Sequence, residues 1–324
     1  MVICAALGLS NHTLSLMMSE LYRPLYSSVL TLTASEIFMT QHFIVIGNPI
    51  AHSKSPKIHT LFAAHTGMDI SYQRQYCPDD ADSFTAVVEA FFCGGGIGAN
   101  VTVPFKQVAY ECCAARGGLS EHAKIAGAVN TLLLNKGLLD KGVPLTEALY
   151  GDNTDGQGLI NHVKSLSWPL TGARVAIIGA GGAVRGIILP LIESGIATLI
   201  IANRTVSKAV ELVEELSTAS AAIDNQQIRT CSTAELDGSF DIIINATSIG
   251  LSDEKLPLCD DLNCQYAYDL MYGRTLPFLQ HFEARGAQVS DGYGMLIGQA
   301  ALSFERWTGR RIDVAEATED LNKS

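Results

Sequence analysis

The segment RVAIIGAGGAVRG, residues 174–186, decides the fold of the region around it. The apolar run Val175 to Ile178 is typical of a buried strand, and it leads directly into a glycine-rich turn. We expect Gly179 to allow the tight turn and Gly181 to let backbone N–H groups approach a pyrophosphate. Val184 stands at the third position of the G-x-G-x-x-G pattern, where Gly or Ala is usual. The turn by itself therefore leaves two alternatives, a dinucleotide site or a plain strand-to-helix connection.

The next strand indicates which dinucleotide would bind. The run TLIIANRT ends about 24 residues after Gly179, where an NAD-preferring site has Asp or Glu on the ribose 2′-hydroxyl. Here the chain has Asn203, Arg204 and Thr205, with Lys208 one turn later. A guanidinium can pair with a 2′-phosphate in a forked geometry, whereas a carboxylate would repel it, so we predict NADP. The alternative is that these basic residues only begin a solvated helix.

Length and composition limit the class of protein. With 324 residues, 48% of them apolar, the chain can bury a sizeable core, and we expect two domains. The 22 Lys and Arg residues against 33 Asp and Glu give a net charge of −11 with no basic block, so we expect neither nucleic acid nor a membrane as partner. The 8 cysteines form no C-x-x-C motif and no zinc spacing. We therefore expect free thiols, a cytoplasmic location and no metal.

The first 38 residues differ from the rest of the chain. The run MVICAALGL is apolar, but no basic residue precedes it, the first being Arg23, and it is too short to span a bilayer. It fits neither a signal peptide nor a transmembrane helix. Met39 is followed by TQHFIVIGNP, which is typical of the opening strand of a domain. We expect residues 1–38 to be a loosely held extension or an upstream-start artefact.

From Phe43 onward, apolar strand-like runs alternate with helical patterns. FIVIG, ISYQRQYC, GANVTV and AVNTLLL are separated by helix-like segments that begin near Pro56, Asp80 and Lys106. This alternation predicts an α/β domain with a largely parallel sheet. A polar stretch then predicts a hairpin or loop that ends at a domain boundary near Asp155. A second series follows with ARVAIIGAGG, ATLIIANRT, FDIIINATS, YAYDLMY and AQVSDGYG, so we predict a second α/β domain of Rossmann type.

Polar residues interrupt the apolar pattern of the first domain. Ser55 before Pro56 is a helix-start signal with Ser55 as the N-cap, and capping alone would explain this serine. Together with Ser53, beside the positive end of a helix, it would also suit a small carboxylate. Asn100 and Thr102 alternate with valines, so both side chains face one way on a strand, as a satisfied polar patch or as a cavity wall.

Lys106 closes the segment GANVTVPFK, and it is the residue most suited to chemistry. Reduction of a ketone by hydride needs a group that gives a proton to the developing hydroxyl. A lysine ammonium can donate that proton, and a nearby carboxylate such as Asp155, in GDNTDG, would hold it in place. An arbitrary lysine at this place would more simply begin a surface helix, and an Asp in such a turn is commonly an Asx cap.

The motifs, taken in order, resemble those of shikimate dehydrogenase. They are GNPIAHSKSPKIH, GANVTVPFK, AGAVNT, GDNTDGQG, GAGGAVRG, NRT, INATSIG and DGYGMLIGQAALSFERWTG, and they cover the chain from about Phe43 to Gly309. The resemblance implies reduction of 3-dehydroshikimate to shikimate by NADPH, in the biosynthesis of aromatic amino acids through chorismate. It also implies two α/β domains with a cleft between them: 39–154 with 294–324 for the substrate, and 155–293 for NADP.

The resemblance also assigns roles to residues of this chain. Lys106 and Asp155 match the pair that transfers the proton. The substrate-binding positions are Ser53, Ser55, Thr102, Asn130, Asp155, Tyr272 and Gln299. The cofactor-binding positions are Glu121, Gly179, Ala180, Gly181, Gly182, Ala183, Asn203, Arg204, Thr205, Lys208, Leu270, Gly292 and Met295. The chain departs from the family in residues 1–38 and in the enlarged segment NKGLLDKGVPLTEALY, for which we expect no effect on the site.

Three other functions remain open at this point. A quinate/shikimate dehydrogenase is the first, and NRT argues against it because quinate users often prefer NAD. A methylene-tetrahydrofolate dehydrogenase shares the two-domain plan, but the pair SKSP and NVTVPFK disfavours it. A non-catalytic sensor of dinucleotide or shikimate is the third, and the intact Lys106 and Asp155 argue against it. For the assembly, a homodimer is the candidate.

Overall fold

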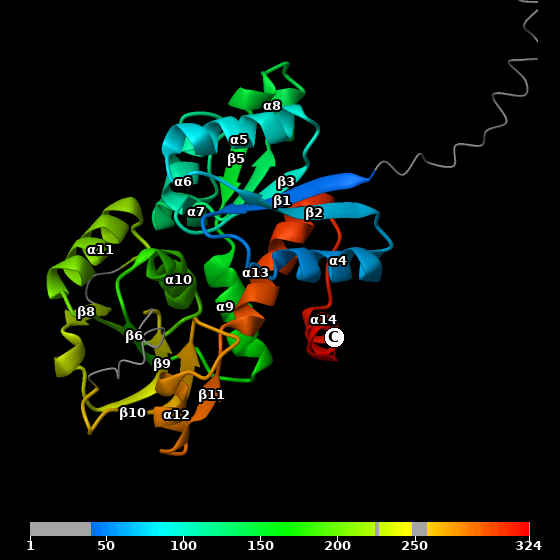
Figure 1. Cartoon of the computed structure of the whole chain (residues 1–324). Helices are drawn as coiled ribbons and strands as arrows, with labels where there is room; N and C mark the ends of the chain where they lie inside the picture. Colours follow the sequence, from blue (N-terminus) through cyan, green and yellow to red (C-terminus); the bar gives the residue numbers. More distant parts are fainter. Residues whose placement is uncertain (1–39, 224–226, 248–257, 324) are drawn as a thin grey trace, which may run out of the picture. The chain divides into compact units, whose positions relative to one another are not determined.

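The computed structural model describes residues 40–223, 227–247 and 258–323. The expectation for residues 1–38 and the end of the motif INATSIG lie outside these ranges. From Gln41 onward the chain forms one compact unit, which contains two β-sheets (Figure 1). We call each sheet, together with the helices that share its core, a lobe. The expected pair of α/β domains, the second with a Rossmann-type parallel sheet, is confirmed.

The first sheet has the strand order β2-β1-β3-β4-β5. Its strands are β1 (Gln41–Gly47), β2 (Ile70–Tyr76), β3 (Gly98–Val101), β4 (Thr131–Leu134) and β5 (Leu149–Asp152). β1 pairs in parallel with β2 and β3, but β4 pairs antiparallel with β3 and with β5. The expectation of a largely parallel sheet is therefore wrong for half of it, whereas the expected hairpin before Asp155 is confirmed.

The antiparallel half follows from the connection between β3 and β4. Two helices stand there, α6 (Lys106–Ala114) and α7 (Glu121–Ala126), instead of the single crossover helix of a βαβ unit. The second helix adds one reversal, so the chain enters β4 from the opposite end of the sheet. The sequence pattern of an apolar strand is the same in either direction, and the mistake could not be seen from periodicity.

The helices of the first lobe begin close to the predicted places. They are α4 (Ser55–Thr66), α5 (Ala81–Cys93), α6, α7 and the short α8 (Lys136–Leu139), with a 3₁₀ turn η1 (Leu145–Glu147). The predicted cap at Ser55 is wrong by one residue. Lys54 holds the N-cap position, and the Ser55 hydroxyl makes no capping bond. The Ser53 hydroxyl instead accepts a hydrogen bond from the Ser55 N–H, at 3.3 Å, and so satisfies a free donor of the first turn.

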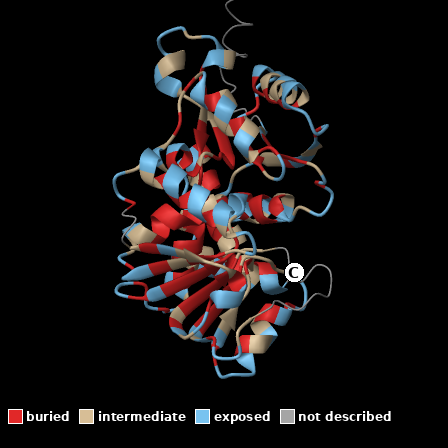
Figure 2. Cartoon of the chain, turned by 90° about the vertical axis from the view of Figure 1, so that its left-hand side faces the viewer, coloured by how far each residue is buried: buried red, intermediate tan, exposed pale blue. Residues whose placement is uncertain are grey.

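The second sheet is parallel throughout, in the order β11-β10-β9-β6-β7-β8. Its strands are β6 (Arg174–Ile178), β7 (Thr198–Ala202), β8 (Ile228–Cys231), β9 (Ser239–Asn245), β10 (Asn263–Asp269) and β11 (Gln288–Ser290). Figure 2 shows the buried residues of this sheet; they dominate the central strands β6 and β9, whereas the residues of the edge strand β11 are exposed or half-buried. The order reverses between β6 and β9, and such a switch point is where doubly wound folds bind ligands. The sequence analysis missed β8.

The helices of the second lobe are α9 (Asp155–Ser165), α10 (Gly182–Glu193), α11 (Val206–Ala219) and α12 (Pro277–Glu283), with a 3₁₀ turn η2 (Thr233–Glu235). After β11 the chain returns to the first lobe as α13 (Tyr293–Thr308) and α14 (Val314–Lys323). α13 packs against both α9 and α4, and it joins the two lobes (Figure 1). The expected domain border at Asp155 coincides with the start of α9.

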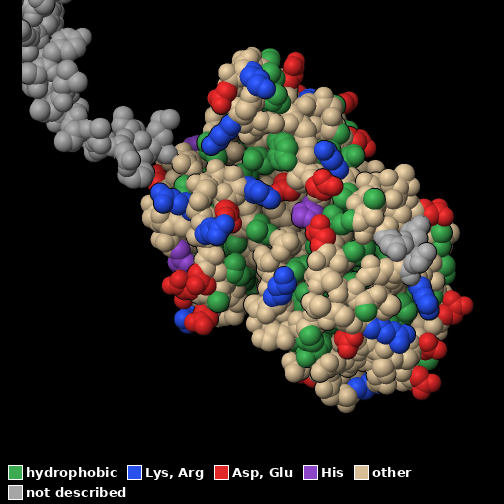
Figure 3. All heavy atoms as spheres, turned by 180° about the vertical axis from the view of Figure 1, so that it is seen from behind, with side chains coloured by type: hydrophobic (Ala, Val, Ile, Leu, Met, Phe, Trp, Pro, Cys, Tyr) green, Lys and Arg blue, Asp and Glu red, His purple; other side chains and the backbone are tan. Residues whose placement is uncertain are grey.

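Charged side chains of both signs share the surface. Figure 3 shows basic and acidic side chains intermixed over the face seen from behind, with no continuous basic area there. Among the described residues, no helix combines the length and the apolar character that a bilayer crossing needs.

Candidate active site

A cavity of about 490 Å³ lies between the strand ends of the first sheet and the residues that follow β10 and β11. Its lining contains most of the residues that the sequence analysis selected. These are Ser53, Ser55, Thr102, Lys106, Asn130, Asp155, Ala183, Leu270, Tyr272, Gly292, Met295 and Gln299. Residues that are far apart in the sequence thus meet in one space, with contributions from both lobes.

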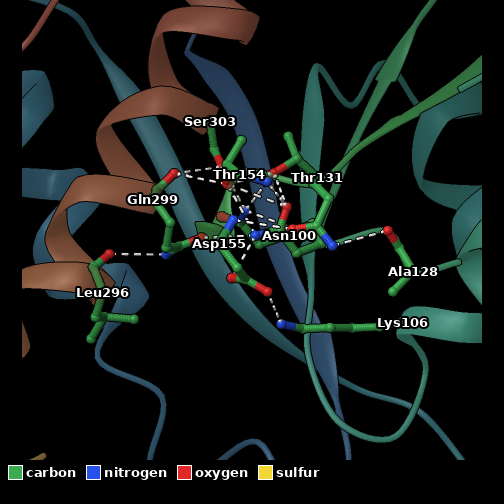
Figure 4. Close-up of polar contacts among 11 residues, drawn as sticks. Asn100, Lys106, Ala128, Thr131, Thr154, Asp155, Leu296, Gln299 and Ser303 are labelled. Atoms are coloured by element: carbon green, nitrogen blue, oxygen red, sulfur yellow. Dashed lines mark hydrogen bonds and ion pairs between the residues drawn. The ribbon is translucent and has the colours of Figure 1, made fainter. Parts of the chain in front are cut away.

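Lys106 and Asp155 form an ion pair inside this cavity. Each is the first residue of a helix, Lys106 of α6 and Asp155 of α9, and the Nζ–Oδ2 distance is 2.5 Å. The side chains are 27% and 13% exposed, so Lys106 keeps access to the cavity (Figure 4). The other oxygen of Asp155 accepts a hydrogen bond from Asn130 Nδ2 at 2.8 Å. The N-terminal position in α9 also favours the negative charge, and the carboxylate is therefore held in one orientation.

Asn130 links this pair to a buried polar network. Its Oδ1 accepts hydrogen bonds from the Thr154 N–H at 3.0 Å and from Thr131 Oγ1 at 2.9 Å. Its Nδ2 also reaches Gln299 Oε1 at 3.3 Å, and Gln299 Nε2 donates to the carbonyl of Leu296 at 3.0 Å (Figure 4). Because the amide of Asn130 is bound on both sides, it is fixed without help from a ligand.

Asn100 and Thr102 do not play equal parts, although both line the cavity. Asn100 is buried, its Oδ1 accepts from Tyr72 Oη at 2.6 Å, and its Nδ2 donates to Ser303 Oγ at 3.0 Å. It is thus a satisfied polar group within the cavity wall, so both alternatives hold for it. Thr102 is half-buried and follows the end of β3. Of the two, Thr102 is the one with an available hydroxyl in the cavity.

Ser53 and Ser55 lie at the N-terminus of α4, where backbone N–H groups point outward. Arg74 on β2 holds the Ser53 carbonyl in a fork, with Nε at 3.0 Å and Nη2 at 2.6 Å. The loop between β1 and α4 is thereby fixed in front of the sheet. Two hydroxyls at a positive helix end form a site that fits a carboxylate.

The sequence analysis missed several residues that support the site. Thr154, buried between Asn130 and α13, donates to the carbonyl of Gln299 at 3.2 Å. Asp152 is also buried, and accepts from Ser120 Oγ at 2.5 Å and Arg306 Nε at 2.9 Å. A signal was present, because the run GDNTDG is polar throughout although it begins within β5, a largely buried strand. Only Asp155 was selected from it.

The glycine-rich turn lies next to the cavity. Gly179 has a φ of +119°, a conformation that other residues rarely adopt, and Val184 is buried in the core of the second lobe. No described atom lies within 4 Å of a Cβ built on Gly181 or Gly182. α10 begins at Gly182, so its free N–H groups face this open space. Gly182 and Ala183 also line a neighbouring cavity of about 620 Å³.

The remaining cofactor positions lie outside the cavity. Arg204 and Lys208 are exposed between β7 and the first turn of α11, and neither forms an ion pair within the described ranges. Asn203 Nδ2 donates to the carbonyl of Thr205 at 2.7 Å and so shapes this turn. Ala180 is half-buried against the core of the second lobe. Glu121 is exposed at the start of α7 and lines neither cavity, so the structure does not bring it to the site.

Burial raises the pKa values of two groups at or near the cavity. Burial raises the pKa of Asp269, the last residue of β10, to about 6, although Asn245 Nδ2 and the Met271 N–H donate to its carboxylate. Burial also raises the pKa of Tyr272, which lines the cavity. The tyrosine hydroxyl therefore remains protonated and can donate a hydrogen bond.

Three family models match the chain, one after another. They are the shikimate dehydrogenase substrate binding domain over residues 45–132, the shikimate / quinate 5-dehydrogenase model over 162–252, and the shikimate 5′-dehydrogenase C-terminal domain over 292–319. The matches fall on both lobes and on the returning helices. Their order along the chain agrees with the order of the motifs.

Individual relatives agree with these matches. The shikimate dehydrogenase (NADP(+)) of Psychrobacter arcticus is 79% identical over 88% of this chain and 99% of its own length. That of Acinetobacter baylyi is 44% identical over 86% of this chain and 99% of its own length. Among solved structures, shikimate 5-dehydrogenase of Thermus thermophilus in complex with NADP(H) and shikimate has a TM-score of 0.72 at 29% identity, covering 88% of this chain and 98% of that one. The chain belongs to the shikimate dehydrogenase family.

Proposed function

We propose that the protein catalyses the reversible, NADPH-dependent reduction of 3-dehydroshikimate to shikimate, a step in aromatic amino acid biosynthesis. The observation that carries the proposal is the Lys106–Asp155 pair, at 2.5 Å, in a cavity that also contains the two serines at the N-terminus of α4. A cyclic hydroxy acid needs one anion site and one proton donor, at a distance from each other. The family and the NADP named for the relatives support the same reaction.

The residues divide the work on the substrate as follows. Ser53 and Ser55 bind the carboxylate, and the positive end of α4 adds to the attraction. Thr102, Asn130 and Gln299 bind the ring hydroxyls. Tyr272 closes the opposite wall of the cavity and donates from its hydroxyl. This division orients the carbonyl carbon toward the second lobe.

Lys106 performs the proton transfer. In the reduction its ammonium donates a proton to the carbonyl oxygen as the C–O bond becomes a hydroxyl. In the oxidation the neutral amine takes that proton back. Asp155 orients the ammonium and keeps a countercharge beside it, and Asn130 holds the carboxylate in turn. The pair therefore acts as one unit whose geometry is held by contacts within the protein.

The residues at the switch point fit a nicotinamide dinucleotide. The open space at Gly181 and Gly182, before the free N–H groups of α10, fits a pyrophosphate. Asn203, Arg204, Thr205 and Lys208 would hold the 2′-phosphate of NADP, and Leu270, Gly292 and Met295 the nicotinamide. When bound, the cofactor supplies or accepts the hydride. Glu121 lines neither cavity, and we therefore assign it no contact with the cofactor.

Domain roles, location and assembly are proposed with the function. Residues 39–154 with 294–324 would bind the substrate, and 155–293 would bind NADP. The 8 cysteines without a disulfide motif support the cytoplasm as the location. A homodimer is the proposed assembly, which sedimentation analysis of the purified chain would test.

The experiment that tests the function crosses two substrates with two cofactors. Shikimate and quinate are each assayed with NADP⁺ and NAD⁺, following reduced nicotinamide by absorbance. We expect shikimate with NADP⁺ to have the highest kcat/KM by more than about tenfold, a difference that one charge-assisted contact can give. Equal rates with quinate would favour a quinate/shikimate dehydrogenase. Binding without turnover in any combination would favour a sensor and contradict the proposal.

A further inference from the structure

Lys54 holds a position that the proposed reaction does not use. It lies between Ser53 and Ser55, in the loop that joins β1 to α4. Its Nζ stands 4.6 Å from the ring centroid of Tyr293 and 5.3 Å from that of Tyr272. These distances are within the range of cation–π attraction. Within the described ranges Lys54 forms no ion pair, so its ammonium interacts with the two aromatic rings instead.

The two rings come from different parts of the molecule. Tyr272 follows β10 in the second lobe. Tyr293 is the first residue of α13, which returns to the first lobe, and it packs against the core cluster that contains Ile58 and Phe62 of α4. Their centroids are 5.9 Å apart and the planes are inclined by 41°, which leaves the ammonium over both faces. The contact therefore connects the carboxylate loop of the first lobe to the two chain segments that leave the second sheet.

Lys54 stands at the rim of the cavity. It does not line the cavity itself, but its neighbours Ser53 and Ser55 line it from one side and Tyr272 lines it from the other. Any movement that separates the lobes at this edge must pull the ammonium away from the ring of Tyr272. Arg74 already fixes the loop to β2 through the Ser53 carbonyl, so the loop would move together with the first lobe.

We propose that Lys54 is a positioning residue, a clamp across the cavity rim that holds the serine pair and Tyr272 at the separation required by the substrate. The proposal rests on the proposed function, since it concerns the substrate of the same site. Lys54 does not touch the reacting atoms. Its contribution is to reduce the opening of the cavity, and therefore to raise the affinity for shikimate rather than the rate of the chemical step.

A different role for Lys54 would be direct contact with the substrate carboxylate. Both roles predict weaker shikimate binding in Lys54→Met, which keeps the length of the side chain but removes its charge. They differ when Tyr293 is changed, because Tyr293 does not line the cavity. In a clamp the two residues act through one contact, which is lost when either residue is changed. The losses of shikimate affinity in Lys54→Met and Tyr293→Leu would then be less than additive. Direct contact would make the two effects add.

The first measurement is shikimate affinity by titration calorimetry. We expect Lys54→Met and Tyr293→Leu each to weaken binding about three- to tenfold, as befits a cation over partly exposed rings, with the double variant no weaker than about the worse single one. Lys54→Arg and Tyr293→Phe should bind within about twofold of the parent, because a guanidinium and a phenyl ring preserve the contact. Lys57→Met, on the exposed side of α4, is the control. Additive losses would overturn the clamp.

The second measurement needs no substrate. Amide hydrogen exchange of the ligand-free protein should become faster in residues 48–57 and 270–293 of Lys54→Met, and stay unchanged in Lys57→Met. Unchanged exchange in both segments would also overturn the clamp. Turnover of the parent is measured separately. A parent that does not turn over shikimate rejects the proposed function, whereas the exchange experiment still decides on the clamp.

Discussion

The two ends of the site are built in opposite ways. At the substrate end, Lys106, Asp155 and Asn130 are bound to one another and to the buried network behind them. At the cofactor edge, Gly182 faces open space and Arg204 forms no ion pair within the described ranges. The first end has protein partners for its charges, whereas Arg204 at the second end has no charged partner among the described residues.

This difference indicates that the protein itself fixes the geometry at the substrate end, whereas the dinucleotide completes the contacts at the cofactor edge. Acid–base chemistry needs a proton donor within hydrogen-bond reach of one oxygen, so the protein fixes that donor in advance. A dinucleotide carries its own phosphates, and its charges complete the contacts of a helix N-terminus and of nearby cations. The substrate end should therefore respond to substitution through turnover, and the cofactor edge through affinity.

The largest effect is expected at Lys106. Lys106→Ala should lower kcat by about 10²–10⁴-fold, the usual loss for an acid–base group, with a much smaller change in shikimate affinity. Lys106→Arg should be nearly as poor, because a guanidinium with a pKa above about 12 gives up its proton reluctantly. Steady-state kinetics measure both. The effect of Asp155→Asn should be less than additive with Lys106→Ala, since the two residues act as one unit.

A folded Lys106→Ala protein that binds NADPH and turns over within a few-fold of the parent would contradict the mechanism. It would show that the fixed pair is a structural ion pair. The expectation that substitutions at the substrate end act through turnover would then be wrong.

Arg204 tests the opposite end. Arg204→Asp should raise the KM for NADP⁺ about 10- to 100-fold, since a charge-assisted hydrogen bond contributes about 1.5–3 kcal/mol, and should change the KM for NAD⁺ much less. The kcat at saturating NADP⁺ should stay close to that of the parent. Equal changes for both cofactors would show that Arg204 does not contact the 2′-phosphate.

His59, on α4 of the first lobe, is a polar side chain that lacks the paired contacts of the substrate end. It is fully buried and stacks on Tyr72 at 4.2 Å. Its ring nitrogens make no hydrogen bond of normal geometry, and the nearby Asn100 side chain opposes the effect of burial only in part. Burial lowers its pKa to about 3. Because the unfolded state takes up a proton below about pH 6.5 and the folded state does not, stability is lost as the pH falls.

We therefore compare the parent with His59→Phe, which keeps the ring but cannot be protonated. Between pH 7.5 and 5 the parent should lose about 2 kcal/mol of unfolding free energy relative to the variant, at about 1.4 kcal/mol per pH unit. Urea unfolding at both pH values measures the difference. A constant difference would mean that His59 is not neutral and unpaired in the fold.

Gly182 gives the smallest effect and the most direct test of the open space. Gly182→Ala adds a methyl group where no described atom lies within 4 Å, so the unfolding free energy should not fall. NADP⁺ affinity should nevertheless drop about three- to tenfold, because the backbone can no longer approach the pyrophosphate as closely. Gly179→Ala is the contrast, since its φ of +119° makes it destabilising. Unchanged NADP⁺ affinity in Gly182→Ala would place the cofactor elsewhere.

Sequence reasoning reached the parts of the molecule that local patterns describe. The strand and turn around Gly179 were predicted because an apolar run followed by glycines has one common solution. β8 was missed because only Ile228 of its four residues is buried, so no apolar run marks the strand. The direction of β4 was missed because periodicity carries no direction.

Within the site, Lys106 and Asp155 were selected through the resemblance, and their contact then appeared in the structure. Thr154 and Arg74 were missed because their partners lie in other elements. The contact of Lys54 with Tyr272 and Tyr293 likewise depends on two lobes meeting. No local pattern contains such information.

The return of the chain to the first lobe has a consequence for its synthesis. Ile58 and Phe62 of α4 are covered by Ile297 and Phe304 of α13 and by Leu321 of α14. A ribosome makes these helices after the whole second sheet. The apolar face of α4 must therefore stay uncovered while more than two hundred further residues are translated, and we expect nascent chains that stop before α13 to be the species that chaperones bind.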